Sequence, residues 1–129
     1  MKHIIATTVL TVALTGGAVT AHAEGDAAAG EKVFKSQCTR CHTIDDGGKN
    51  KVGPNLFGVF GGTAGVRVAS FEKRHSKAMK ESGVVWNEET LDGFLAAPKK
   101  FMPKNRMAYG GVKKDGDREN LIAYLKAAK

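Results

Sequence analysis

The sequence predicts an all-α fold, in which helices are joined by glycine-rich loops. Segments 26–37, 87–96 and about 117–127 repeat apolar residues at helical spacing, and the first two begin with a capping Asp or Asn. No segment shows the convincing alternation of a strand. Two long stretches, 43–74 and 99–116, have little periodicity and are interrupted by glycine. Together these features indicate one small helical domain.

Residues 1–23 have the pattern of a cleavable secretory signal peptide. A short positive start is followed by a charge-free apolar run over 4–19, and then by the small-x-small site Ala21-His22-Ala23. An uncleaved membrane anchor is the alternative, but the run is short and rich in Thr and Gly. We therefore expect residues 24–129 to form a single domain in the periplasm. No other segment is apolar enough to cross a bilayer.

The first half of this domain is expected to hold one helix and a long loop. Asp26 can cap a helix through about Gln37, which carries Val33 and Phe34 on its apolar side. Gly30 costs about 1 kcal/mol there relative to alanine. It either marks close packing against another helix or reflects composition alone. A loop as long as 43–74 in so small a domain implies something that it wraps.

The second half is expected to hold three helices. A short helix is plausible over 76–81, and the next helix covers 87–96 and is ended by Pro98. The loop 99–116 then leads to a final helix over about 117–127, which buries its apolar side.

The segment Cys38-Thr39-Arg40-Cys41-His42 has the spacing of a c-type haem attachment motif. Each cysteine sulfur adds to one vinyl group of the porphyrin, and this tether brings the next residue under the iron. His42 then offers a ring nitrogen as the proximal axial ligand. The sequence therefore predicts one haem c, bound covalently through Cys38 and Cys41, with His42 on the metal.

Three other functions of a C-x-x-C pair are less well supported. A structural zinc site needs four protein ligands, whereas His75 is the only other histidine after the signal peptide and there are no further cysteines. A thioredoxin-like site expects a strand–helix–strand context. A plain disulfide suits an exported protein but gives no reason for the adjacent His42.

The sixth iron ligand decides between an electron carrier and a catalyst, because an open face would admit peroxide or oxygen. Met79 lies in an expected helix, where a packing role is favoured. Met102 precedes Pro103, which forces its backbone to be extended. Met107 lies deep in a loop and is the preferred ligand, followed by Met102 and His75, with a core methionine as the alternative.

The chain resembles class I cytochromes c, most closely a short cytochrome c2 of purple bacteria, and it is also similar to mitochondrial cytochrome c. The resemblance covers essentially all of residues 24–129. It rests on Gly25-Asp26, Gly30, Phe34, the Cys38–His42 motif, Lys51–Leu56, Trp86, Glu88–Leu91, Pro98–Phe101, Met107–Gly111 and Leu121–Leu125.

The resemblance implies roles for individual residues. Met107 is the expected sixth ligand, and Pro54 is expected to offer its carbonyl to the ring N–H of His42. Trp86 would direct its indole N–H toward a haem propionate, unless it is an ordinary buried aromatic. Asn105 stands where the family often has a hydroxyl near a propionate. A further implication is that Gly30 and Phe34 pack against Leu121 and Tyr124.

Three positions depart from the family pattern. His75 stands where a tyrosine usually bonds a propionate, Phe94 replaces a tyrosine near the ligand sulfur, and Gly62 replaces an arginine. We therefore expect the electronic properties of the haem to differ from family norms. If His75 lies near a propionate, the redox potential should depend on pH around its titration.

The charge balance indicates an acidic partner. Removing the signal peptide takes away Lys2 and no acid, so the formal net charge falls from +7 to +6. Nucleic acid is not expected as the partner of an exported haem protein. Nine basic residues are expected to gather around the haem edge and steer docking to acidic surfaces: Lys35, Lys49, Lys51, Lys99, Lys100, Lys104, Arg106, Lys113 and Lys114.

The function expected from these features is single-electron transfer by a soluble monomer that is not an enzyme. The resemblance implies transient contacts with membrane redox complexes, such as a bc1-type complex and a photosynthetic reaction centre or terminal oxidase. Two alternatives remain open at this point. One is a small peroxidase or ligand sensor with an open iron face, and the other is a haem-free thiol redox protein.

Overall fold

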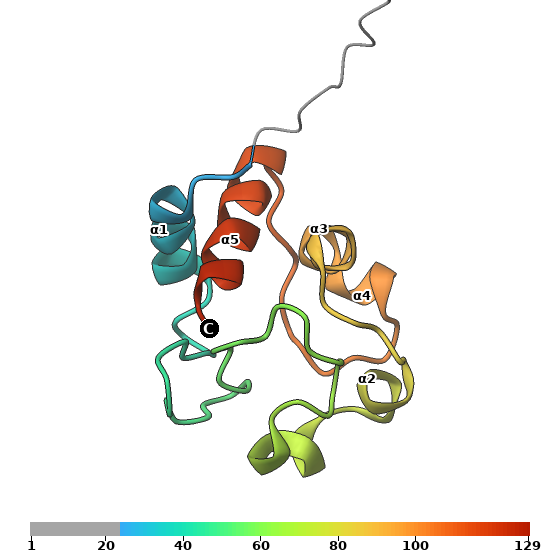
Figure 1. The fold of residues 1–129 in the computed structure, drawn as a ribbon. Coiled ribbons are helices and arrows are strands. Elements are labelled where there is room, and N and C mark those ends of the chain that lie inside the picture. The colour runs from blue at the N-terminus through green and yellow to red at the C-terminus, as the bar shows by residue number, and fades with distance from the viewer. Residues whose placement is uncertain (1–23) are drawn as a thin grey trace, which may run out of the picture.

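The computed structural model describes residues 24–129, so the expected signal peptide lies outside the described part. The elements in chain order are α1 (Ala27–Gln37), a 3₁₀ helix (Ala69–Arg74), α2 (Lys77–Glu81), α3 (Glu88–Ala96), α4 (Pro98–Phe101) and α5 (Asp115–Ala127) (Figure 1). Over residues 24–129 the only β pairing is an isolated bridge between Thr63 and Val85. The prediction of an all-α fold is confirmed. None of the helices in this range is long and apolar enough to cross a membrane.

The crossing of α1 and α5 joins the two ends of the domain (Figure 1). Asp26 caps α1 as expected, because its carboxylate accepts the backbone N–H groups of Ala28 and Ala29. A Cβ at Gly30 would lie 1.9 Å from the carbonyl oxygen of Asn120, so only glycine permits this approach. Close packing against α5 therefore explains the glycine at position 30. The alternative explanation, that Gly30 reflects composition alone, is wrong.

Aromatic side chains extend the same crossing. The rings of Phe34 and Tyr124 are 5.5 Å apart, and Phe34 and Leu121 are almost completely buried. The contact expected between the first and last helices is thus present, and it places the end of α1 firmly on the core.

The long loop after α1 is irregular only as far as residue 68. The expectation of a loop through Arg74 is wrong over Ala69–Arg74, which forms the 3₁₀ helix. The buried ring of Phe71 holds this helix on the domain. A 3₁₀ segment of this length has too few turns to produce a detectable hydrophobic period, which explains why the sequence pattern missed it.

The two middle helices begin where their caps predict. The Ser76 hydroxyl accepts the backbone N–H of Met79 and starts α2, and Gly83 follows the end of α2 with a φ of +65°. Asn87 and Thr90 form a reciprocal capping box at the start of α3.

The expected loop over 99–116 is wrong at both ends. Pro98 is not simply a terminator, because it occupies the first turn of α4, where its missing N–H costs nothing. The break between α3 and α4 falls at Ala97. The last helix begins at Asp115, two residues earlier than expected, and the acidic side chains of Asp115 and Asp117 suit its first turn.

Candidate haem-attachment site

The end of α1 brings the two cysteines and His42 onto one turn of backbone. The N–H of Cys38 bonds the carbonyl of Phe34, and the N–H groups of Cys41 and His42 bond the carbonyl of Cys38 at 3.0 and 2.9 Å. Both cysteines are partly buried and form no disulfide with each other. Burial, with a smaller contribution from Cys41, raises the pKa of the Cys38 thiol to about 11. This thiol is therefore neutral at physiological pH.

The imidazole of His42 is oriented by the loop that follows it. Its Nδ1 lies 2.8 Å from the carbonyl oxygen of Pro54. Because a carbonyl only accepts, Nδ1 carries the proton and Nε2 keeps its lone pair. Burial lowers the pKa of His42, and Lys51 adds to this effect, whereas the bond to Pro54 opposes it. A neutral imidazole with one fixed tautomer is the form that binds iron.

Gly53 lets this loop lie directly against the His42 ring. A Cβ at position 53 would be 2.2 Å from Cε1 of His42. The N–H of Gly53 also bonds the carbonyl of Cys41 at 2.8 Å, which fixes the height of the loop over the motif. Further along, the Asn55 amide donates to Oγ1 of Thr43 at 2.8 Å. The acceptor for His42 is thus held by backbone and side-chain bonds on both sides.

The three methionines occupy different environments. Met102 is only 5 % exposed and belongs to the hydrophobic core, where its thioether is enclosed by protein. Met79 and Met107 are partly buried and pack against that core. The burial of Met102 argues against it as an iron ligand. Ligation by Met107 stays a prediction.

Asn105 has a set of partners that the sequence did not indicate. Its side chain is buried, its amide nitrogen donates to the carbonyls of Pro98 and Met102, both at 2.8 Å, and its amide oxygen accepts the N–H of Met107 at 2.8 Å. Both amide hydrogens are therefore bonded to backbone carbonyls at the two ends of α4. A contact with a propionate stays a prediction.

Trp86 is buried against aromatic neighbours. Its ring centre lies 4.9 Å from that of Phe94, which in turn lies 6.0 Å from that of Phe101. Its backbone pairs with Gly61 and Gly62. The role of the indole N–H toward a propionate stays a prediction.

His75 follows the 3₁₀ helix, and its ring packs edge-on against Phe71 at 4.9 Å. Burial lowers the pKa of His75, and the positive charge of Lys80 lowers it further. The ring is thus neutral at physiological pH.

An arginine that the sequence did not single out covers Gly62. A Cβ at position 62 would lie 2.5 Å from Cδ of Arg67, and the Arg67 guanidinium donates to the carbonyl of Gly58. The chain therefore supplies a cation beside Gly62 from five residues further along. The spacing alone gave no signal for this arrangement, because it depends on how the loop folds back.

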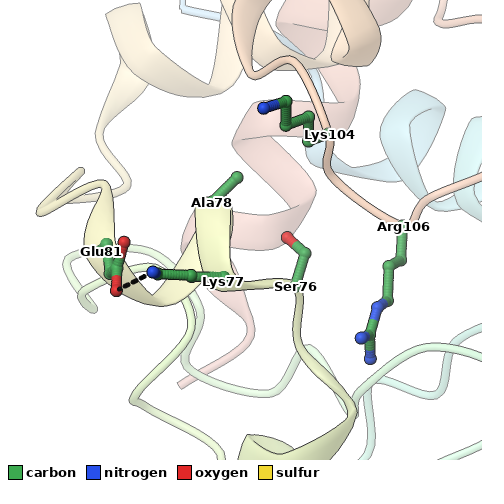
Figure 2. Close-up of a pocket in the computed structure, with 6 residues that line it drawn as sticks. All are labelled: Ser76, Lys77, Ala78, Glu81, Lys104 and Arg106. Atoms are coloured by element: carbon green, nitrogen blue, oxygen red, sulfur yellow. Dashed lines mark ion pairs between the residues drawn. The ribbon is translucent and has the colours of Figure 1, made fainter.

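The nine basic residues expected around the haem edge are all exposed. Two of them, Lys104 and Arg106, line a pocket of about 430 Å³ between α2 and the loop before Met107 (Figure 2). The acid in this pocket, Glu81, is paired with Lys77 at 3.7 Å. The Ser76 hydroxyl already accepts a backbone N–H as the cap of α2. The pocket therefore contributes positive charge to the surface between α2 and the Met107 loop, and it does not present a free nucleophile.

The described residues fit a covalently held haem better than the alternatives. Over residues 24–129 no three His, Cys, Asp or Glu side chains lie together as a metal site, which argues against structural zinc. The two cysteines, the oriented imidazole and the partly buried apolar side chains that pack against the core provide tethers, an axial ligand and apolar surface. These apolar side chains include Leu56, Val59, Met79 and Met107.

Comparison with known proteins identifies the family. The model of the family described as Cytochrome c matches residues 27–129. Cytochrome c of Chlamydomonas reinhardtii is 51% identical over 104 residues, which cover 81% of this chain and 90% of that protein. Cytochrome c of Theileria annulata is 49% identical over 105 residues, which cover 81% and 88%.

A solved structure gives the same result. Cytochrome cH from Methylobacterium extorquens superposes with a TM-score of 0.73 and 42% identity, over 80% of this chain and 99% of that one. These relatives are named cytochrome c or cytochrome cH, so membership of the c2 subgroup stays a prediction. Cytochromes c carry one covalently bound haem c, and the cysteines required for it are present. The chain belongs to the cytochrome c family, whose members are haem-based electron carriers.

Proposed function

We propose that this protein is a periplasmic single-electron carrier of the cytochrome c2 type, in which His42 and Met107 are the two axial ligands of the haem. The observation that carries the proposal is the bond between His42 Nδ1 and the Pro54 carbonyl at 2.8 Å, which leaves Nε2 free to bind iron. The bound haem supplies a one-electron redox centre. With both axial positions occupied, the protein does not act as an enzyme on small ligands.

The residues of the chain support this role by holding the ligands still. Pro54 keeps the His42 ring in one tautomer and orientation. On the other side, the N–H of Met107 is fixed by Asn105 and the loop packs against the core. Because neither ligand has to move, electron transfer costs little rearrangement of the protein.

The decisive experiment is the visible spectrum of the oxidised mature protein, including the weak long-wavelength sulfur-to-iron band. Met107→Ala should abolish the band and allow imidazole or cyanide to bind the ferric protein readily. Met79→Leu is the matched control, because it removes a partly buried thioether but nearly conserves volume. If Met107→Ala left the band and the ligand inertness unchanged, the proposal would be wrong. Rapid binding of carbon monoxide to the ferrous wild type would instead favour the peroxidase or sensor.

The exposed basic residues support transient docking to acidic surfaces of membrane redox complexes, such as a bc1-type complex and a reaction centre or oxidase. Association should slow steeply with salt, since the Debye length falls from about 10 Å at 0.1 M to about 3 Å at 1 M. A transfer rate that ignores ionic strength would contradict this docking mode. Purified protein that begins at Glu24 in the periplasmic fraction would support export.

A further inference from the structure

We propose that Asn105 is a positioning residue that locks the loop carrying Met107 and so sets how often the sixth iron position opens. The inference rests on the proposed ligation by Met107. Its physical basis is that one buried side chain joins the backbone at the two ends of α4 to the N–H of Met107 in the irregular segment that follows.

The amide of Asn105 uses both of its donor hydrogens and its acceptor oxygen for this purpose. Its two hydrogens go to the carbonyls of Pro98, in the first turn of α4, and of Met102, just after that helix, both at 2.8 Å. Its oxygen accepts the N–H of Met107 at 2.8 Å. The residue is 2 % exposed, so water cannot replace these partners without opening the loop.

This arrangement fixes the start of the segment that leads to Met107. Met107 lies two residues beyond Asn105, so a bond to its N–H restricts both its position and the direction of its side chain. The backbone carbonyl of Asn105 also accepts from Lys99 of α4, and its N–H bonds the Met102 carbonyl at 3.3 Å. Helix α4 thus acts as the fixed base of the loop.

An asparagine suits this function better than the hydroxyl that relatives often carry here. A serine or threonine has one donor hydrogen, whereas joining the carbonyls of Pro98 and Met102 to the N–H of Met107 through one side chain takes two donors and one acceptor. Only a primary amide supplies all three groups from a single short side chain.

The experiment compares variants of the holoprotein by three measurements. Asn105→Ala should speed imidazole uptake by the ferric protein at least about tenfold, a change that corresponds to about 1.4 kcal/mol. It should also cause the sulfur-to-iron band to disappear at lower urea than the far-ultraviolet helix signal. In the ferrous protein, hydrogen exchange at the Met107 amide should accelerate.

Asn105→Asp separates the effect of the two donor bonds from that of the acceptor bond. It keeps the acceptor for the Met107 N–H but loses both donors, so the Met107 amide should stay protected while imidazole uptake rises. Asn87→Ala is the matched control, because it removes an asparagine bond of similar length, 2.9 Å to the Thr90 N–H, at the far end of α3. It should lower the urea midpoint of the whole protein and leave imidazole uptake within about twofold.

Two results would overturn the inference. One is a rate of imidazole uptake in Asn105→Ala equal to that of the wild type. The other is an increase in this rate in Asn87→Ala that is as large, relative to the stability lost, as the increase in Asn105→Ala. Failure of the proposed function looks different, because Met107→Ala would then leave the band unchanged. A Met107→Ala variant that loses the band beside an Asn105→Ala variant that behaves as wild type rejects the inference alone.

Discussion

The His42 side and the Met107 side of the expected haem site are built in opposite ways. On the His42 side, three functional residues lie within five consecutive positions, and the acceptor for the imidazole comes from Pro54, twelve residues further on. The backbone of the motif continues the turn begun by α1. Local sequence therefore specifies most of its geometry.

The Met107 side depends on contacts that are distant in the sequence. The hydroxyl of Tyr109 donates to the side-chain oxygen of Gln37, 72 residues away at the end of α1. After the loop, the N–H of Val112 bonds the carbonyl of Leu95 at 2.8 Å, and the Val112 carbonyl accepts from Arg118 of α5 at 3.1 Å. A loop held in this manner can open locally while the rest of the domain stays folded.

Backbone strain also distinguishes the two sides. Lys104 has a φ of +66° and is the only non-glycine residue with a positive φ in the described part of the chain. It follows Pro103 in a turn closed by the bond from the Asn105 N–H to the Met102 carbonyl, the pattern of a type II turn, which favours glycine at this position. The comparison teaches that the His42 side is fixed by close packing and hydrogen bonds within a short stretch of sequence, whereas the Met107 side carries backbone strain and also depends on hydrogen bonds to distant parts of the chain.

The largest expected effect comes from breaking the His42 side. Gly53→Ala places a methyl group 2.2 Å from the imidazole carbon Cε1, so either the ring or the loop bearing the Pro54 carbonyl must shift. We expect a loss of about 2–3 kcal/mol in the free energy of unfolding, measured by urea denaturation of the holoprotein.

Gly110→Ala is the control for this substitution. Gly110 belongs to the Met107 side, has nothing within 4 Å of an added Cβ and has no positive φ. Its change should stay within about 0.5 kcal/mol. Equal losses in the two variants would contradict the view that the loss in Gly53→Ala comes from its contact with the His42 ring.

A smaller effect, of opposite sign, is expected from relieving strain on the Met107 side. A side chain in the left-handed region destabilises the folded state by about 1–2 kcal/mol, which glycine would relieve. Glycine also increases the conformational entropy of the unfolded chain, and this offsets part of the stabilisation. Lys104→Gly should therefore stabilise the protein by about 0.5–1 kcal/mol, measured by urea denaturation, and slow imidazole uptake several-fold.

Lys104→Ala removes the same charge but keeps the Cβ, so it separates backbone strain from electrostatics. It should give no stabilisation. If it stabilised the protein as much as glycine does, repulsion among the basic side chains would be the cause, and the argument from strain would be wrong.

The difference between the two sides also explains what the sequence could predict. The motif, the caps at Asp26 and Asn87 and the apolar period of the long helices are local signals, so the all-α fold and α1, α3 and α5 were predicted to within two residues at their ends. Helix α4 was missed because Pro98 stops one helix and starts another, and local propensity does not distinguish these cases.

The partners of Asn105 and Arg67 could not be predicted, for a different reason. Both side chains lie in irregular segments and bond backbone carbonyls, and which carbonyl each one reaches is decided by how the loop folds rather than by residue type. Close packing at Gly30 was only one of the two explanations that the sequence allowed. A glycine in a helix can indicate that another element lies close, but it does not indicate which residue, here Asn120, makes the contact.

The smallest expected effect concerns pH and the region next to the Met107 loop. Arg106, the neighbour of Met107, donates to the carbonyl of Arg74 at 3.0 Å, which places this loop beside His75. Burial and the charge of Lys80 lower the pKa of His75. The proton is therefore bound more weakly by the folded chain than by the unfolded one. The contribution of neutral His75 to the free energy of unfolding is fully present above about pH 6.5, the ordinary histidine pKa. It is lost as the pH falls below this value.

The same titration should appear in the redox potential if His75 lies near the haem. A protonated His75 adds positive charge and favours the ferrous state, so the potential should fall as pH rises through the range below about 6.5. His75→Phe should flatten this response in a spectroelectrochemical titration and remove the matching loss of stability in acid. His42 cannot replace it, because a ligated imidazole does not take up a proton in this range. A potential that still varies with pH in His75→Phe would assign the titration to another group, whereas loss of the stability effect alone would place His75 away from the redox centre.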